Sequence, residues 1–219
     1  MLEKMSEFFE NRLDGYDAHM LNNIDSATEF YPFTASLLPR KNCRVLDLGC
    51  GTGLELEFYF RLNPSAEITG IDLSGGMLDA LKAKFPEKKL NLIQGSYFDV
   101  PFGKELFDCA VSVESLHHFT KDEKIPLYKK VFQALKQDGC FVLTDYFALS
   151  EQEEIMHRME LLNLKAEQGI KDNEFYHYDT PLTVAHETEA LYEAGFSSVQ
   201  VLKNWGATYT FKAEKHPHS

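Results

Sequence analysis

The chain has 219 residues, a formal net charge of -12 and 44% hydrophobic residues. This hydrophobic content is typical of folded globular proteins and excludes a chain that stays disordered. The acidic balance argues against a nucleic-acid partner, because a protein that holds a phosphate backbone needs a basic face. No apolar run approaches the roughly 18 residues of a membrane span, so we expect no membrane partner and a cytoplasmic location.

The first forty residues are predicted to form a helical segment in front of the core. Between residues 3 and 22 apolar side chains recur at helical spacing, which predicts an amphipathic helix or a helix pair: Phe8, Phe9, Leu13, Tyr16 and Met20. Such a segment either closes over a bound molecule or docks on the edge of a sheet. The spacing suits both arrangements.

From residue 43 to residue 147, short β-branched runs alternate with segments of helical period. The predicted strands are 43–48, 66–73, 90–95, 107–113 and 139–147. The predicted helices are 53–62, 75–85 and 121–136. Alternation of this kind predicts right-handed βαβ units and a mostly parallel sheet.

The last third of the chain departs from this alternation. Residues 151–170 predict an amphipathic helix within an insertion, 148–180, that is expected to cap a substrate pocket. Pro181 is predicted to start a helix that Gly195 ends. Two final strands, 196–204 and 207–213, predict an antiparallel hairpin with its turn at Trp205 and Gly206.

These elements predict one α/β domain over residues 1–219, with a doubly wound seven-stranded, mostly parallel sheet and an antiparallel C-terminal hairpin. Within it we distinguish a helical lid (1–40), a core (41–147), the cap (148–180) and a C-terminal helix with the hairpin (181–219). The four cysteines, Cys43, Cys50, Cys109 and Cys140, form no C-x-x-C pair. Neither a disulfide framework nor a metal site is therefore expected.

The run VLDLGCGTGL, residues 45–54, places glycines at positions 49, 51 and 53 directly after a strand. Glycine permits positive φ and lets a molecule lie against bare backbone at the carboxyl end of the strand. The dinucleotide fingerprint is G-x-G-x-x-G, and Leu54 occupies the place of its third glycine. Asp72, at the end of the next strand, is near the offset at which an acid binds ribose hydroxyls. The pattern predicts a ribose without a pyrophosphate.

VLDLGCGTG followed by GIDLS resembles the first two motifs of the class I S-adenosylmethionine-dependent methyltransferases. Three later segments are similar to that family's further motifs and follow in the same order: GSYFDVPF (95–102), FDCAVSVESLHHF (107–119) and LKQDGCFVLTDYF (135–147). The resemblance covers 43–147 by motif and 181–212 by the order of elements. It implies S-adenosylmethionine as the cofactor, S-adenosylhomocysteine as the product, a small-molecule substrate, and a monomer or homodimer.

The resemblance also implies a role for each matching residue. Asp47 and the backbone of Gly49, Cys50, Gly51 and Gly53 would cradle the methionyl part of the cofactor, with Arg12 at its carboxylate and Tyr16 closing over it. Asp72 would bind the ribose hydroxyls, Leu73 and Met77 would sandwich the adenine, and Ser96 and Tyr97 would flank the adenine edge. Val113 and Glu114 would border the sulfonium. Ser96 departs from the family, which usually has an acid there, and a serine hydroxyl is the weaker acceptor.

Methyl transfer from a sulfonium is a direct displacement, so positioning and proton removal are what the protein adds. His117, Tyr16 and Tyr146 are the candidate catalytic residues, with His118 and Glu114 beside them. The alternative for the two histidines is a packing turn. A magnesium site of the catechol type is disfavoured, because no acid and asparagine pair follows Asp145.

The sequence thus predicts methyl transfer to a small molecule whose identity it does not give. One alternative is an atypical user of the same cofactor with carboxymethyl chemistry, since the C-terminal order of helix, hairpin and GATYTFKA is similar to that of the carboxy-S-adenosylmethionine synthases. Another is a module that binds the cofactor without chemistry. A nicotinamide oxidoreductase is disfavoured by Leu54.

Overall fold

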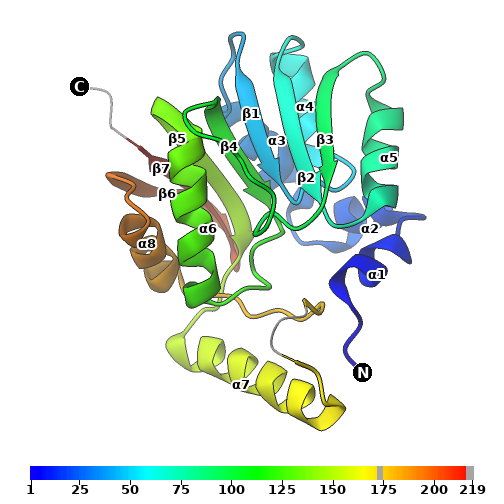
Figure 1. The fold of residues 1–219 in the computed structure, drawn as a ribbon, viewed down its shortest axis with the longest axis vertical. Helices are drawn as coiled ribbons and strands as arrows, with labels where there is room; N and C mark the ends of the chain where they lie inside the picture. Colours follow the sequence, from blue (N-terminus) through cyan, green and yellow to red (C-terminus); the bar gives the residue numbers. More distant parts are fainter. Residues whose placement is uncertain (172–174, 216–219) are drawn as a thin grey trace.

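A seven-stranded sheet forms the centre of the computed structural model, which describes residues 1–171 and 175–215 (Figure 1). Its strand order is β3-β2-β1-β4-β5-β7-β6. The strands are β1 (Arg44–Leu48), β2 (Glu67–Asp72), β3 (Lys89–Gln94), β4 (Phe107–Val113), β5 (Leu135–Tyr146), β6 (Ser198–Trp205) and β7 (Thr208–Glu214). Strands β1 to β5 pair in parallel, and β7 pairs antiparallel with both β5 and β6. The predicted fold class and C-terminal hairpin are confirmed.

Helices cover both faces of this sheet. They are α1 (Met5–Glu10), α2 (Tyr16–Asn23), α3 (Ala27–Leu37), α4 (Leu54–Leu62), α5 (Gly75–Lys84), α6 (Lys121–Ala134), α7 (Glu151–Gln168) and α8 (Val184–Glu193). Side chains of α6 and α8 pack in one core cluster, and those of α3, α4 and α5 in another. Alternate residues of β1 serve the two clusters, Val45 on one face and Leu46 on the other, as a strand buried on both sides requires.

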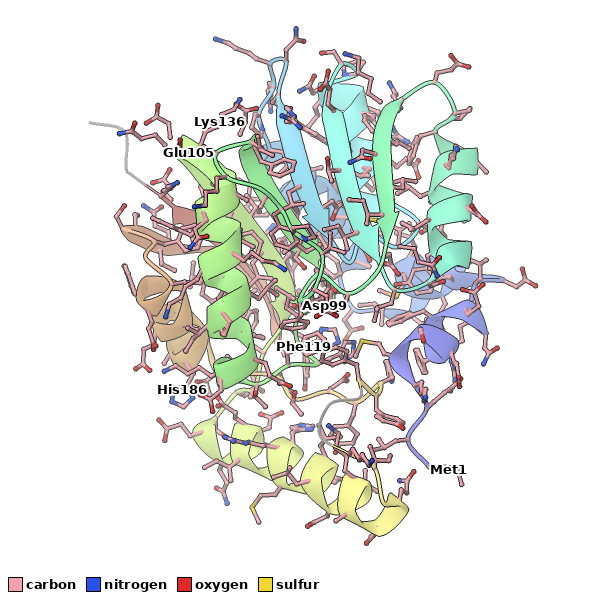
Figure 2. The ribbon with its side chains drawn as sticks, viewed as in Figure 1. Met1, Asp99, Glu105, Phe119, Lys136 and His186 are labelled. Carbon is pink, nitrogen blue, oxygen red and sulfur yellow. The ribbon has the colours of Figure 1, made fainter. Side chains whose placement is uncertain are left out.

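The carboxyl ends of the parallel strands gather at one end of the molecule. In Figure 2 this is the lower end of the sheet, near the labelled Asp99 and Phe119, while Glu105 and Lys136 mark the opposite end. Open α/β sheets bind their ligands at the carboxyl ends of their strands. Helices α1 and α2 also lie at this end (Figure 1).

Helix α3 lies within the helical segment predicted for residues 1–40, but outside the helix or helix pair predicted over 3–22. Pro32 lies inside it, and an interior proline removes a backbone hydrogen bond and usually ends a helix. Here the buried face, which includes Phe30, Tyr31 and Ala35, packs against the second core cluster. Tertiary packing therefore outweighs the local penalty of Pro32.

Two predicted boundaries are wrong. The helix predicted over 121–136 ends at Ala134, because Leu135 takes extended dihedrals and pairs with Phe107, so that β5 begins without a loop. The helix predicted to start at Pro181 starts at Val184, where the side chain of Thr183 accepts from the backbone N–H of His186 at 3.2 Å. The carbonyl of Leu182 does not begin the helix, since it accepts a hydrogen bond from the backbone N–H of Ala148 at 3.0 Å.

Helix α7 extends away from the rest of the fold (Figure 1) and contributes no buried residue. Residues 172–174 of the predicted cap lie outside the described part of the chain. Among the described helices, none combines the length and the apolar character needed to cross a membrane.

Candidate active site

The loop after β1 folds back on itself at three glycines. Gly49, Gly51 and Gly53 have φ of 70°, 47° and 73°, in the left-handed region that favours glycine. A Cβ at Gly49 would overlap the side chain of Ser115, whereas a Cβ at Gly51 would meet nothing within 4 Å. The backbone at Gly51 therefore faces open space.

Asp72 ends β2 opposite this loop. Its Oδ2 accepts from the backbone N–H of Gly51 at 2.9 Å, and its Oδ1 accepts from the backbone N–H of Ser74 at 2.9 Å. Burial raises the pKa of Asp72, although these two amides oppose the shift. The two bonds hold the carboxylate on the loop, in the position that the sequence predicted for an acid that meets a ribose.

A pocket of about 50 Å³ lies between the loop and Asp72, and we call it the glycine pocket. Nine of the predicted cofactor-binding residues line it: Tyr16, Gly49, Gly51, Asp72, Leu73, Met77, Tyr97, Val113 and Glu114. Met5 and Phe9 from α1 complete its wall together with Ser115 and His118. Residues predicted from five separate segments of the sequence therefore line one pocket.

Five predicted cofactor-binding residues lie away from that wall: Arg12, Asp47, Cys50, Gly53 and Ser96. Asp47 is buried below the loop beside Glu55, and burial together with the Glu55 carboxyl raises the pKa of Asp47. One oxygen of each, Asp47 Oδ2 and Glu55 Oε1, lacks a hydrogen-bond partner. Ser96 Oγ accepts from the backbone N–H of Phe98 at 3.2 Å, so its lone pairs are partly engaged within its own turn.

The helix pair α1 and α2 covers the glycine pocket as a lid. Glu10 Oε2 accepts from Ser74 Oγ at 2.6 Å and from the backbone N–H of Gly76 at 3.2 Å, which fastens α1 to the start of α5. Asp17 pairs with Lys84 Nζ at 2.5 Å. The lid side chains Met5, Phe9 and Tyr16 occupy space in front of the loop, which accounts for the small volume of the pocket.

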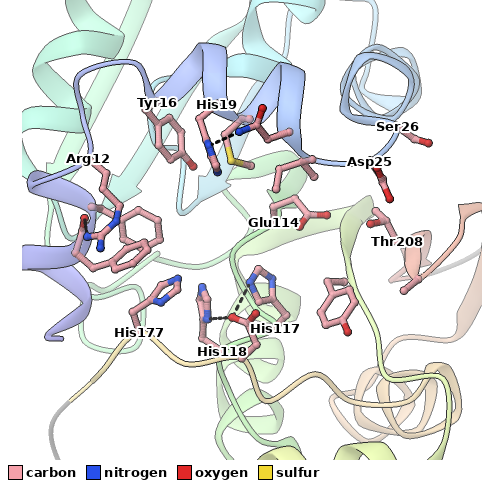
Figure 3. A pocket seen from close by; sticks show the side chains of 18 of the residues that line it. Arg12, Tyr16, His19, Asp25, Ser26, Glu114, His117, His118, His177 and Thr208 are labelled. Atoms are coloured by element: carbon pink, nitrogen blue, oxygen red, sulfur yellow. Dashed lines mark hydrogen bonds and ion pairs between the residues drawn. The ribbon is translucent and has the colours of Figure 1, made fainter. Parts of the chain in front are cut away.

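A second, larger space of about 1040 Å³ adjoins the glycine pocket, and we call it the large cavity (Figure 3). Phe9, Tyr16, Glu114 and His118 line both spaces. The three predicted catalytic residues, Tyr16, His117 and Tyr146, all lie on the wall of the large cavity. Arg12 also lines the large cavity and not the glycine pocket.

His117 and Asp145 form a hydrogen-bonded pair at the floor of the large cavity. His117 follows β4 and Asp145 lies near the end of β5, its parallel neighbour, in which Val113 pairs with Thr144. His117 Nδ1 donates to Asp145 Oδ1 at 2.5 Å, and Asp145 Oδ2 accepts from the backbone N–H of Leu116 at 2.7 Å. A carboxylate on Nδ1 orients the ring, as an acid orients a catalytic histidine, and Nε2 lies 3.5 Å from Asp179 Oδ1.

The charges around His117 set its protonation state. Burial lowers the pKa of an imidazole, but the Asp145 carboxylate, with Asp179 and Glu114, outweighs burial and raises the pKa of His117 to about 9. Burial and the neighbouring His117 lower the pKa of His118. Burial and His118 likewise lower the pKa of His177 to about 4. One imidazolium and two neutral imidazoles therefore share this region at neutral pH.

Glu114 stands at the junction of the two spaces. Its φ of 50° is unusual for a residue other than glycine, and its backbone N–H donates to the Thr144 carbonyl at 2.8 Å. Oε1 is buried without a hydrogen-bond partner. Burial and the charge of Asp145 raise the pKa of Glu114 to about 8.

Both phenols of the predicted catalytic set keep their protons at neutral pH. Burial raises the pKa of Tyr16 and of Tyr146. The ring of Tyr146 lies 6.2 Å from that of His117. A tyrosine with a raised pKa is a hydrogen-bond donor and not a base, so His117 is the candidate that can accept a proton.

Three residues near His117 were not predicted as site residues from the sequence. They are Asp145, which pairs with His117, and two residues of the cavity wall, His177 and Asp179. Asp145 could have been found, because residues after neighbouring parallel strands meet at the same sheet edge. Asp179 lies far along the chain beyond α7, where backbone bonds such as that from the Thr180 N–H to the His117 carbonyl, at 2.8 Å, bring its segment to the site.

Comparison with known proteins agrees with this geometry. Residues 45–139 match a family described as a methyltransferase domain. The carboxy-S-adenosyl-L-methionine synthase of Wolinella succinogenes is 29% identical over 197 residues, covering 84% of this chain and 80% of that protein. The erythromycin 3''-O-methyltransferase of Saccharopolyspora erythraea is 30% identical over 113 residues, 50% of this chain and 36% of that protein.

A solved structure extends the likeness to the whole fold. Human N-acetylserotonin methyltransferase, in complex with S-adenosylmethionine, has a TM-score of 0.64 at 17% identity, covering 96% of this chain and 55% of that chain. At this identity the match shows the fold alone. Taken with the match of residues 45–139 to a methyltransferase domain, the glycine loop and the acid that ends β2, it supports the resemblance of this chain to the class I S-adenosylmethionine-dependent methyltransferases.

Proposed function

We propose that the protein transfers a methyl group from S-adenosylmethionine to a small molecule bound in the large cavity. The observation that carries this proposal is the shared wall: Tyr16 and Glu114 line both the glycine pocket and the large cavity. A cofactor held on the glycine loop is therefore adjacent to any molecule in the large cavity. Enzymes of direct displacement gain most of their rate from such positioning.

The residues of the glycine pocket fit the cofactor. Gly51 offers bare backbone beside open space, and Asp72 offers a fixed carboxylate for ribose hydroxyls. Leu73 and Met77 offer apolar surfaces for a flat ring. S-adenosylmethionine, when bound, supplies an electrophilic methyl group on a sulfonium. Because the pocket measures about 50 Å³, the lid helices must shift outward to admit it.

His117 would act as the general base. Asp145 holds the ring of His117 through Nδ1, and His117 lines the large cavity. A carboxylate in this position stabilises the imidazolium that forms when the histidine accepts a proton. Tyr146 would orient the acceptor by donating a hydrogen bond. His117 must first lose its own proton, which its raised pKa makes dependent on pH and on nearby positive charge.

The similarity to a carboxy-S-adenosyl-L-methionine synthase over 84% of the chain favours carboxymethyl chemistry as a second candidate. The charge of the large cavity weighs against it. Among the described residues of that wall, Arg12 is the only lysine or arginine, and it is already paired with Glu3 Oε2 at 3.1 Å. The His117 imidazolium is paired with Asp145 Oδ1 at 2.5 Å and lies 3.5 Å from Asp179 Oδ1. A carboxylate carried on the cofactor would therefore find no unpaired cation there, and we favour methyl transfer.

The test incubates the full chain with S-adenosylmethionine and a panel of hydroxyl, amine, thiol and carbon nucleophiles, and measures S-adenosylhomocysteine. We expect turnover that His117→Gln lowers by about 10²- to 10⁴-fold, while His157→Gln, on α7 and away from both spaces, leaves the rate unchanged. Cofactor binding without any product would favour the module that performs no chemistry. A carboxylated cofactor found by mass spectrometry in the purified protein would favour the second candidate.

A further inference from the structure

We propose that the acceptor carries an ammonium group, and that the carboxyl groups of Glu114 and Asp179, each beside His117, bind it. This inference rests on the proposed function, because it assigns a class of acceptor to the same large cavity. It concerns binding of the acceptor and leaves open which atom receives the methyl group.

The balance of charged side chains on the wall favours a cation. Four carboxylic acids line the large cavity: Asp14, Asp25, Glu114 and Asp179. The guanidinium of Arg12 is directed elsewhere, since it also donates to the Phe8 carbonyl at 3.0 Å and stacks 3.7 Å above the Phe8 ring. The other cation of the described wall, the His117 imidazolium, already lies between Asp145 and Asp179, so an anionic acceptor would lack an unpaired partner there.

Two carboxyl oxygens on this wall lack a donor. Glu114 Oε1 and Asp179 Oδ1 are both shielded from solvent and have no well-aligned hydrogen bond. Asp179 Oδ1 lies 3.1 Å from His118 Nδ1, which also lies 3.2 Å from the Tyr178 carbonyl, and 3.5 Å from Nε2 of the His117 imidazolium. A shielded acceptor without a donor costs free energy, and a bound ammonium supplies donors of the strongest kind.

Aromatic rings complete an environment suited to a cation. Phe9, Tyr16, Tyr146 and Trp205 line the large cavity. Ring faces attract ammonium groups through their quadrupoles, and an acceptor with a charged head and an apolar body would satisfy both kinds of wall.

An ammonium at this position would also act on the base. Before an acceptor binds, the imidazolium of His117 is itself the cation beside the carboxylates of Asp145 and Asp179. A second positive charge beside those carboxylates lowers the pKa of His117, so binding of the acceptor favours the neutral imidazole. Binding of the correct class of acceptor would thereby prepare the base.

The test compares three molecules with the same ring and chain length but different heads: tyramine with an ammonium, tyrosol with a hydroxyl and phloretate with a carboxylate. Each is titrated calorimetrically into the full chain saturated with S-adenosylhomocysteine. We expect tyramine to bind at least about tenfold more tightly than tyrosol, as charge-assisted hydrogen bonds imply, and phloretate to bind most weakly.

Variants separate the two named carboxylates from general electrostatics. Asp179→Asn and Glu114→Gln should each remove most of the tyramine preference, while Asp138→Asn, at an exposed position that lines neither space, should change it less than twofold. The far-UV circular dichroism spectrum reports that each variant is folded, because Glu114 also lines the glycine pocket and could itself affect cofactor affinity.

Tyrosol or phloretate binding as tightly as tyramine would overturn the inference, and so would the absence of tyramine binding at millimolar concentration. In both cases saturation with S-adenosylhomocysteine would leave the proposed function standing. Failure of the wild-type chain to bind S-adenosylhomocysteine at all would instead reject the proposed function, and this inference with it.

Discussion

His117 lies among three carboxyl groups, and its hydrogen bond to Asp145 fixes both its orientation and its charge. Its pKa of about 9 lies above the ordinary histidine value of about 6.5. The imidazolium therefore contributes stability that is fully present below about pH 6.5 and is lost as the pH rises through about 9. As a base, by contrast, His117 becomes competent only as that proton leaves.

We therefore expect kcat/KM for a hydroxyl acceptor to rise with pH and to level off near pH 9, since this parameter reports the free enzyme. Asp145→Asn removes the carboxylate that raises the pKa of His117, so the rising limb should move to lower pH. The plateau should fall by about 10²- to 10⁴-fold, because the tautomer is no longer fixed. A pH–rate profile with the same limb in both proteins would contradict this role for Asp145.

Among single residues of the site, those that belong to local motifs could be predicted from the sequence. The glycines of the β1 loop and Asp72 could be identified, because strand-end motifs carry their own geometry. Asp179 and His177 could not be identified, because their place depends on how residues 175–180 cross the site after α7. Ser96 shows the opposite: the motif predicts that it flanks the adenine, but it does not line the glycine pocket.

The elements of the core could be predicted because apolar periodicity, together with segment length and β-branched content, distinguishes buried strands from helices. The exceptions have causes that this pattern does not show. Pro32 hides α3, Leu135 passes directly from α6 into β5, and Thr183 rather than Pro181 caps α8. In each case a tertiary contact decides between two locally acceptable conformations.

Helices α6 and α8 are joined by a buried ion pair. Lys124 Nζ donates to Glu187 Oε2 at 2.7 Å, the side chains are 1% and 0% exposed, and Tyr128 donates to the same carboxylate. Glu187→Ala leaves the Lys124 ammonium buried without a partner, so we expect a loss of about 3 to 5 kcal/mol in the free energy of unfolding.

Denaturant unfolding followed by circular dichroism measures this loss. The matched control is Glu189→Ala, two residues further along α8, whose ion pair with Lys121 is largely exposed. It should change stability little. Equal effects of the two substitutions would show that the buried pair does not tie the helices together.

The lid depends on Glu10, which connects α1 to Ser74 and Gly76. Glu10→Ala should loosen α1, so that S-adenosylhomocysteine dissociates a few times faster and trypsin cleaves more readily at Arg12. Stopped-flow displacement and timed proteolysis measure the two effects. Glu7→Ala, an exposed acid on the same helix, is the control, and equal behaviour of both variants would argue against a latch at Glu10.

Across the whole molecule, distant segments close the site together. The backbone N–H of Met5 donates to the Phe175 carbonyl at 3.1 Å, and that of His177 donates to the Glu3 carbonyl at 3.0 Å. The first helix and the chain beyond α7 therefore form one cover over the glycine pocket and the large cavity. No local sequence pattern predicts that residues 3–5 pair with residues 175–177, since the two segments meet only in the folded chain.

A ligand that binds under this cover should stabilise the whole fold. At one hundred times its Kd, S-adenosylhomocysteine adds about 2.7 kcal/mol to the free energy of unfolding, which corresponds to an increase of about 5 to 10 °C in Tm for a chain of this size. Differential scanning fluorimetry measures the shift. NADH is the control, and an equal shift with NADH would favour the oxidoreductase that Leu54 disfavours.

The central claim is that the glycine loop and Asp72 bind S-adenosylmethionine, and calorimetric titration of the full chain with S-adenosylhomocysteine tests it most directly. We predict binding to one site, weakened by about ten- to a hundredfold in Asp72→Ala, as expected for the loss of hydrogen bonds to a charged group. No heat of binding at millimolar concentration, or an unchanged affinity in Asp72→Ala, would contradict the assignment.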